Sequence, residues 1–353
     1  MATLQEYTCP FCGGVVEFDS TAQKPVCPYC DTEFDIEELK AAQKNETGDA
    51  SKTEASPEIN DEGLYVYICN SCGGEVVTDT TTAASHCPYC SNPIIMKGQF
   101  AGDLCPDLVI PFKLDKKAAK AAFMKHLTGK PLLPKVFKTE NHIDEIKGLY
   151  VPFWLFDAHA DGDFTYEATR VRRYETPNHR VTETKYYSVR RHGGLDFSAI
   201  PVDGSEKMAN DLMESLEPFD LSDAVDFETA YLSGYLADRW DVESNEAIER
   251  AKQRITESTD DELRATVSGY NSVIKQSGTV NVTPRSSKYI LLPVWILNTT
   301  WRQQKFVFAM NGQTGKFVGN LPIDKGAYFR HLIIGGLIAS PIVFIILAIM
   351  SLL

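Results

Sequence analysis

Two four-cysteine motifs with the same internal spacing constrain this chain more than any other feature. Each motif has the form CxxC-x14-CxxC, and the second repeats the first 60 residues later in the sequence. Four thiolates at this spacing form two tight knuckles that converge on one ion, and tetrahedral Zn²⁺ suits such a set. The sequence therefore predicts two zinc ribbons with two structural Zn²⁺ ions, bound by Cys9, Cys12, Cys27 and Cys30 and by Cys69, Cys72, Cys87 and Cys90.

Disulfide bonds and redox-active thiol pairs are the alternatives for these cysteines. Neither accounts for a duplicated four-cysteine set with Gly-Gly after the first knuckle of each copy. Because four thiolates complete the zinc shell, we expect the metal to fold the ribbons and to have no catalytic role. His86 is then a residue outside the ligand set, and Cys105 is a half-buried free thiol.

The motifs and the composition between them divide the chain into five predicted parts. Residues 44–63 are rich in acidic and hydroxyl side chains, which predicts a flexible linker between two independent ribbons. The remaining predicted parts are zinc ribbon 1 (1–43), zinc ribbon 2 (64–98), an α+β domain (99–330) and a membrane helix (331–353).

The α+β domain is predicted from alternating strand and helix patterns. Asp115 is the expected N-cap of a helix that begins at Lys116, and further helices are expected over 205–216 and 222–256. The segments 164–173 and 182–191 alternate as the two strands of a hairpin do, and DAHADGD (157–163) is expected to be a turn.

A short strand unit occurs twice in this domain, as Pro152-Phe153-Trp154-Leu155 and as Pro293-Val294-Trp295-Ile296. Proline is usually confined to sheet edges and strand starts, so each copy is expected to begin a strand. The tryptophans are expected to pack inward.

The C-terminal segment predicts a transmembrane helix. Leu332 to Leu353 contains no charged residue across 22 positions, which is long enough for a helix to cross the hydrocarbon core. Lys316, Lys325 and Arg330 precede this segment, so the positive-inside rule predicts a tail-anchored, single-pass protein of the cell membrane with its N-terminal bulk in the cytoplasm.

Charge argues against a nucleic-acid partner. The chain has a net charge of −13, and residues 1–100 hold 16 acidic against 5 basic residues, a net charge of −11. Such a surface repels a phosphate backbone. The segment 166–192 is the one basic stretch, and a solvated strand face or a contact with anionic lipid headgroups would each explain it. No catalytic motif is present, so we expect a non-enzymatic protein.

The order of these parts resembles a known family. The CPFC/CPYC and CNSC/CPYC knuckles, IPFKLDK, GLYVPFWLFD and LPVWILNTTW with FAMNGQTGKFVGNLP resemble bacterial transcription-factor-IIB-type zinc-ribbon membrane proteins of envelope-stress operons. This resemblance implies an adaptor without catalytic residues. It also implies partners of the SPFH and phage-shock protein A types.

Together the residues and the resemblance predict a multi-domain zinc-ribbon scaffold that recruits cytosolic proteins to the inner membrane face. Two alternatives stay open at this point. One is a nucleic-acid-binding ribbon protein, and the other is an enzyme with an unrecognised site in 99–330. A basic ribbon face would favour the first alternative, and a deep pocket with converging polar groups would favour the second.

Overall fold

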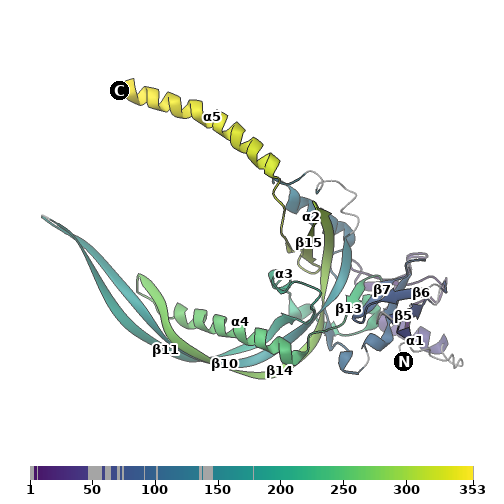
Figure 1. Cartoon of the computed structure of the whole chain (residues 1–353). Helices are drawn as coiled ribbons and strands as arrows, with labels where there is room; N and C mark the ends of the chain where they lie inside the picture. Colours follow the sequence, from purple (N-terminus) through teal and green to yellow (C-terminus); the bar gives the residue numbers. More distant parts are fainter. Residues whose placement is uncertain are drawn as a thin grey trace.

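One mixed β-sheet of 11 strands dominates the architecture. A body of short strands and helices surrounds one part of this sheet, three long strands extend from it as a curved arm, and the zinc ribbons lie on the side of the body away from the arm (Figure 1). The computed structural model describes residues 4–5, 7–46, 58–59, 65–69, 72–73, 75–90, 92–100, 102–134, 137, 146–177 and 179–352.

The elements of the ribbons and of the first part of the body are mostly short. They are β1 (Leu4–Gln5), β2 (Glu17–Asp19), β3 (Lys24–Val26), α1 (Ile36–Glu46), β4 (Glu58–Ile59), β5 (Tyr65–Ile68), β6 (Glu75–Thr78), β7 (Thr82–His86), β8 (Pro93–Met96), η1 (Lys97–Phe100), η2 (Gly102–Leu104), β9 (Leu108–Val109) and α2 (Lys116–Leu127).

The elements of the arm and of the C-terminal half include the longest strands and helices. They are β10 (Lys147–Thr176), β11 (His179–Asp203), α3 (Asn210–Ser215), η5 (Leu221–Asp223), β12 (Val225–Asp226), η6 (Thr229–Leu232), β13 (Leu236–Asp238), α4 (Ser244–Ala265), β14 (Ser272–Trp301), β15 (Gln304–Asn311), β16 (Phe317–Gly319) and α5 (Lys325–Leu352).

Strands β10 and β14 form one antiparallel pair that runs through both the body and the arm, from Lys147↔Ile296 to Thr169↔Ser272. The two copies of the repeated strand unit lie in this pair, well inside their strands and not at their starts. On the edge of β10 away from β14, pairing with β13 ends before Pro152 and pairing with β11 begins after it. On the edge of β14 away from β10, pairing with β9 ends before Pro293 and pairing with β15 begins after it. A proline is tolerated at such a gap because no ladder bond there needs its missing N–H.

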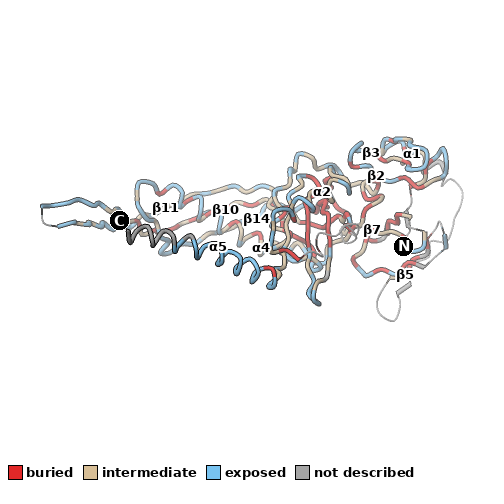
Figure 2. Tube along the Cα trace, turned by 90° about the horizontal axis from the view of Figure 1, so that it is seen from above, coloured by how far each residue is buried: buried red, intermediate tan, exposed pale blue. Residues whose placement is uncertain are grey.

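The arm is a three-stranded sheet, ordered β11–β10–β14, with α4 packed along one face (Figure 1). Helix α4 buries a stripe of small and apolar residues one turn apart: Ala247, Ala251, Ile255, Thr259 and Leu263. Residues four positions apart share one helix face, so this stripe covers the sheet while the charged side chains stay in water. The arm is therefore only two layers thick, and its far end is exposed on all sides (Figure 2).

Aromatic rings fill the core of the body. Phe112 stacks on Tyr235 with centroids 4.2 Å apart, and the edges of Tyr150 and Trp295 meet Phe112 at 5.0 and 5.1 Å. The indole N–H of Trp295 donates to the carbonyl of Leu114, which satisfies its polar group. Both repeated tryptophans pack inward as expected, since the Trp154 indole donates to the carbonyl of Val242.

The predicted fold class is wrong in two respects, and the first concerns the sheet. The ribbons contribute strands to the large sheet, where β8 pairs with β1 and β7, and β7 pairs with β13 of the body. A mixed sheet therefore runs across ribbons, body and arm, and the small sheets β2–β3 and β4–β5–β6 lie beside it in the ribbons. Most of the predicted linker, 44–63, lies outside the described residues, although α1 extends into it as far as Glu46.

The second error is the transmembrane helix. Among the described residues, no helix combines the length and the apolar character that a membrane crossing requires, so the predicted span over 331–353 and the predicted single-pass topology are wrong. In α5, Lys325 and Arg330 lie within the first two turns.

Local predictions had mixed outcomes. Asp115 caps α2 as expected, because its Oδ1 accepts from the amide of Ala118 at 2.7 Å, and the 164–173/182–191 hairpin is confirmed in β10 and β11. The helix expected over 222–256 begins only at Ser244. The segment 157–163 is continuous strand and not a turn, since its polar side chains pair across strands.

We predict that Gly278→Ala destabilises the arm. A Cβ on Gly278 would lie 1.9 Å from Cδ1 of the buried Phe164 ring on the paired strand β10. The ring has to move, and overpacking of this kind costs about 1–3 kcal/mol. Urea unfolding should show the loss, whereas the neighbouring exposed change Ser277→Ala should have little effect. Equal stability of the two variants would contradict this packing.

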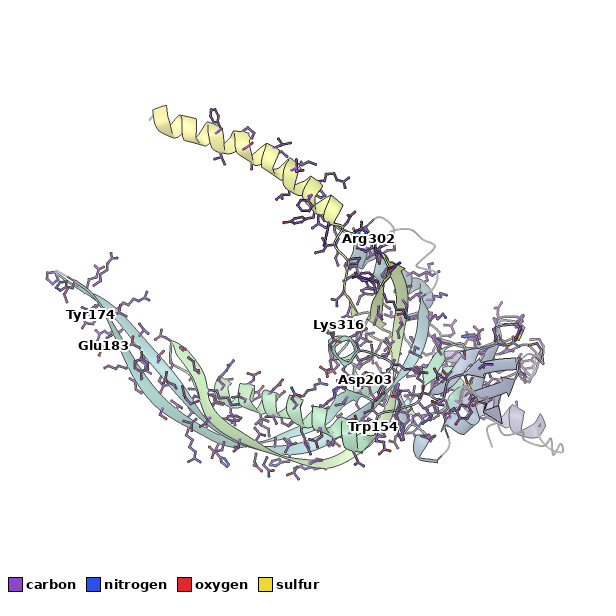
Figure 3. The ribbon with its side chains drawn as sticks, viewed as in Figure 1. Trp154, Tyr174, Glu183, Asp203, Arg302 and Lys316 are labelled. Atoms are coloured by element: carbon purple, nitrogen blue, oxygen red, sulfur yellow. The ribbon has the colours of Figure 1, made fainter. Side chains whose placement is uncertain are left out.

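A second prediction concerns Asp203 at the root of the arm, near Trp154 (Figure 3). Burial raises the pKa of the Asp203 carboxyl from 3.8 to about 7. Its Oδ1 accepts from the amide of Ser205, and its Oδ2 has no partner among the described residues. The pKa of this carboxyl is higher in the folded state than in the unfolded state. Its ionisation therefore lowers the free energy of unfolding increasingly as the pH rises from 3.8 to about 7.

Asp203→Asn should therefore change the free energy of unfolding little at pH 4 and raise it by about 1–3 kcal/mol at pH 8. Denaturation followed at both pH values measures the difference. The exposed change Asp226→Asn is the control. A gain for Asp203→Asn that is independent of pH would show that the buried charge is not its cause.

Candidate metal centres and the ribbon face

The eight predicted ligands form two groups. Within each group the four sulfur atoms all lie within 4.8 Å of one another. One group is Cys9, Cys12, Cys27 and Cys30, and the other is Cys69, Cys72, Cys87 and Cys90. The structure thus brings together every cysteine that the spacing assigned to a site.

The distances between sulfurs fit zinc and exclude disulfides. Pairs of sulfurs are 3.7 Å apart for Cys9 and Cys30, and 3.4 Å apart for Cys12 and Cys27. In the second group the corresponding distances are 3.7 and 3.6 Å. A tetrahedron with Zn–S bonds of about 2.3 Å has edges of about 3.8 Å, whereas a disulfide needs about 2.05 Å. Both groups are positioned to bind a structural zinc ion.

The two sites share one backbone design. After the first knuckle, the amides of Gly13 and Gly73 donate to the carbonyls of Cys9 and Cys69, both at 2.8 Å. The φ angles of Gly13 and Gly73 are +72° and +74°, a conformation that glycine adopts without strain. The first glycine after each first knuckle therefore has a structural cause. The tight turn it closes brings two thiolates to the same side of the metal.

Thr32 contributes to the first site, and the cysteine spacing gave no sign of it. Its hydroxyl lies 3.1 Å from Sγ of Cys30. Hydrogen bonds from this hydroxyl and from the Thr32 amide lower the pKa of the Cys30 thiol to about 6. The thiolate that the metal requires is therefore favoured at neutral pH.

The remaining candidate ligands stay outside both groups, as predicted. Cys105 is exposed and not half-buried, and it belongs to neither cluster. His86 directly precedes Cys87 in the chain and lines a cavity beside the second ribbon. Burial lowers the pKa of its imidazole, with Lys147 and Lys116 acting in the same direction.

Ribbon 1 packs on the body and does not stand apart from it. The hydroxyls of Tyr7 and Thr229 lie 2.5 Å apart, and Ser233 Oγ donates to the carbonyl of Val16 at 2.5 Å. The Phe18 ring meets the edge of Tyr231 at 5.2 Å. These contacts belong to the same apolar core that fills the body, so zinc in this ribbon stabilises one side of a larger unit.

Ribbon 2 is joined to the body by charge as well as by its strands. Lys207 Nζ lies 2.9 Å from a carboxylate oxygen of Asp79 in the ribbon and 2.9 Å from one of Asp238 in β13. The backbone amide of Arg239 donates to the carbonyl of Thr81 at 2.9 Å. The two ribbons are therefore held on one body in fixed positions.

The knuckles present aromatic rings to solvent. Phe11, Tyr29 and Tyr89 lie between the cysteines of three CxxC turns and are 77%, 71% and 70% exposed. Tyr29 packs against Gly14, where a Cβ would lie 2.4 Å from Cδ2 of its ring. Large rings held in place but open on one side are typical of surfaces that bind proteins.

A cavity of about 590 Å³ lies where the two ribbons meet the body. Tyr235 and Trp295 line it, and Glu17, Asp19 and Asp115 each raise the pKa of the Tyr235 phenol, although burial is the larger cause. Two of these carboxylates have structural roles. Asp19 Oδ1 accepts from the amides of Thr21 and Ala22, and Asp115 Oδ1 caps α2.

Comparison with known proteins gives one informative relative. The chain is 35% identical over 340 residues to the uncharacterized protein YdjG of Bacillus subtilis (strain 168), and the match covers 96% of each chain. No protein-family model matches the chain, and no solved structure matches it.

We predict two zinc ions per chain, each lost independently. Cys9→Ser should remove one zinc and Cys69→Ser the other, because a structural site with three thiolates is severely weakened and such sites contribute about 10–16 kcal/mol. Elemental analysis of the purified wild type and of each variant measures the stoichiometry. Cys105→Ser is the matched control and should retain both ions. A single metal in the wild type, or iron in place of zinc, would overturn the assignment.

Proposed function

We propose a docking function for this chain, which belongs to the same family as YdjG of Bacillus subtilis: the two zinc ribbons carry a surface that binds partner proteins. The observation that carries this proposal is the set of exposed rings on the knuckles, Phe11, Tyr29 and Tyr89. Each sits in a turn that a zinc site fixes, so little conformational entropy is lost when a partner covers it.

The chemistry of the sites supports binding in preference to catalysis. Four cysteines around each zinc leave no position for a water or a substrate. Aromatic side chains dominate binding energy at protein interfaces, and the carboxylates around them favour a partner with a basic or mixed surface. Contact with nucleic acid is disfavoured by the net charge of −11 in residues 1–100, where 16 acidic residues face 5 basic ones.

The resemblance to transcription-factor-IIB-type zinc-ribbon proteins of envelope-stress operons supplies candidate partners. It favours an adaptor of the envelope-stress response whose ribbons bind an SPFH-type protein and phage-shock protein A. An adaptor needs a rigid mount for its binding surface. The contacts of both ribbons with the body meet that need.

The cavity between the ribbons favours a second candidate, the binding or conversion of a small polar ligand. It has the size of a ligand site, and titratable side chains line it. We place this function second because Asp19 and Asp115 are already engaged by backbone amides. Thr21→Trp, which would add a large ring to the cavity lining, should leave partner binding unchanged if the knuckle rings carry the function.

The docking function predicts that the ring-deleted variant Phe11→Ser/Tyr29→Ser/Tyr89→Ser binds its partner at least about 100-fold more weakly, because hot-spot aromatics cost about 2 kcal/mol or more each when removed. Binding of the purified full-length chain to each purified candidate partner can be measured by calorimetry. The zinc content should stay at two ions per chain, which separates loss of docking from loss of folding.

Tyr186→Ser is the matched control, since Tyr186 is equally exposed at 70% but lies on the arm. It should retain full affinity. Raising the salt concentration should weaken binding of the wild type, because screening reduces attraction between exposed charges. If the ring-deleted variant and the control bind alike, the ribbon knuckles are not the docking surface.

A further inference from the structure

The far end of the arm is a two-stranded hairpin, whose root contacts the segment before β14: Arg170 Nε donates to the carbonyl of Gly269, and the Val171 amide donates to Asn271 Oδ1. Pairing of β14 with β10 ends at Thr169↔Ser272, and α4 ends at Ala265. Strands β10 and β11 continue together to Thr176↔His179. We call residues 170–185 the hairpin tip. Tyr174 and Glu183 mark it at the end of the molecule farthest from the body (Figure 3).

Such a hairpin gains little from its own packing, because two strands without a covering layer are marginally stable in water. In this part the ring of Tyr174 is exposed to water. Such an extension is therefore better suited to contact with another surface than to support of the arm.

The tip carries the basic charge of an otherwise acidic protein. Residues 170–185 hold five basic against two acidic residues, a net charge of +3 in a chain of net charge −13. Arg180 and Lys185 are paired with Glu175 and Glu183 at 2.8 and 3.3 Å. Within the described part of the chain, no ion pair occupies the guanidinium of Arg172 or Arg173, and Arg172 lies 5.7 Å from the Tyr174 ring.

The opposite end of the molecule has the complementary surface. Ribbon 1 exposes Asp31, Glu33, Glu37 and Glu38, and none of these four forms an ion pair with another described residue. We call these four residues the acidic ribbon face. Asp35, the ion-pair partner of Lys24, raises the pKa of that lysine most, and Glu33 and Glu38 act in the same direction, so both of these carboxylates lie near Lys24. Four thiolates around one Zn²⁺ add a net charge of about −2 beside them.

We propose that the hairpin tip of one copy docks on the acidic ribbon face of a second copy. The end of the arm and the ribbons lie at opposite ends of the molecule, so a tip does not reach its own ribbon (Figure 1). Both surfaces combine charge with exposed aromatic rings, and arginine stacks readily on such rings. Because the contact is head to tail, each pair leaves one tip and one face free, and association continues into a ring or a filament.

A second copy is favoured over the other anionic partners that a basic hairpin could meet. A second copy carries the same net charge of −13 as the first, so the preference rests on local complementarity: the ribbon combines exposed carboxylates with the exposed Phe11 and Tyr29 rings, on which arginine stacks. Another copy brings its complementary face with it. The proposal shares ribbon 1 with the docking function above and in that respect rests on it, but the tip itself has no part in that function.

The test uses three full-length double variants. The tip variant is Arg172→Glu/Arg173→Glu, and the face variant is Glu33→Lys/Glu37→Lys. The control variant, Lys117→Glu/Lys305→Glu, makes the same change in net charge as the tip variant on exposed lysines of α2 and β15. All are kept in one nonionic detergent, so that the exposed apolar side chains of α5 are covered equally.

Sedimentation velocity at low salt should show concentration-dependent association of the wild type and of the control variant. The tip variant and the face variant should each associate at least about tenfold more weakly. An equimolar mixture of these two should form a one-to-one dimer and nothing larger, because the first keeps an intact face and the second an intact tip. Wild-type association should weaken as salt shortens the screening length from about 30 Å at 0.01 M to about 8 Å at 0.15 M.

The proposal is overturned if the mixture stays monomeric or if the tip variant associates as the wild type does. It is equally overturned if the two arginines instead control binding of a labelled oligonucleotide or of phosphatidylglycerol vesicles without changing self-association. The tip variant should still bind the candidate partners of the ribbons. Loss of partner binding in the ring-deleted variant alone would therefore test the docking function separately.

Discussion

The antiparallel pairing of β10 with β14 is the interaction on which the rest of the structure depends. It continues from Lys147↔Ile296 in the body to Thr169↔Ser272 in the arm, so one ladder of backbone hydrogen bonds joins two otherwise separate parts. On the body side, β13, β9 and β15 add to its edges, and in the arm β11 does so. The two prolines mark the points where these neighbours change.

Zinc and the body have complementary tasks in the ribbons. A knuckle of two cysteines cannot bury enough apolar surface to hold its own shape, so the metal fixes the turns that expose Phe11 and Tyr29. The body fixes where those turns point, through the contacts of Tyr7, Val16 and Phe18. The metal therefore shapes the surface, and the body positions it.

The sequence was most informative where chemistry is local. Cysteine spacing located both metal sites, and Asp115 located the start of α2, because each signal depends on residues a few positions apart. Contacts between strands far apart in the sequence could not be predicted from local patterns. The 157–163 segment has the composition of a turn, but Asp157 is satisfied by Ser286 and by the amide of Ala199 from neighbouring strands. Nothing within seven residues predicts partners so far along the chain.

The same limit explains the error about separate ribbons and the residues of the site that were missed. Pairing of β7 with β13 joins residues more than 150 positions apart, and Thr32 becomes important only once the second knuckle has folded. The apolar composition of the C-terminal segment suggested a membrane span, and the described part of α5 does not support one.

The central claim is that zinc shapes the docking surface while the β10–β14 scaffold persists without it. Hydrogen exchange of the full-length protein, before and after removal of zinc by a chelator, tests this claim directly. The amides of Gly13, Asp31 and Gly73, which close the knuckles, should lose their protection, while those of β10 and β14 in the body keep theirs. Unchanged protection of the knuckles, or equal loss throughout the sheet, would contradict the account.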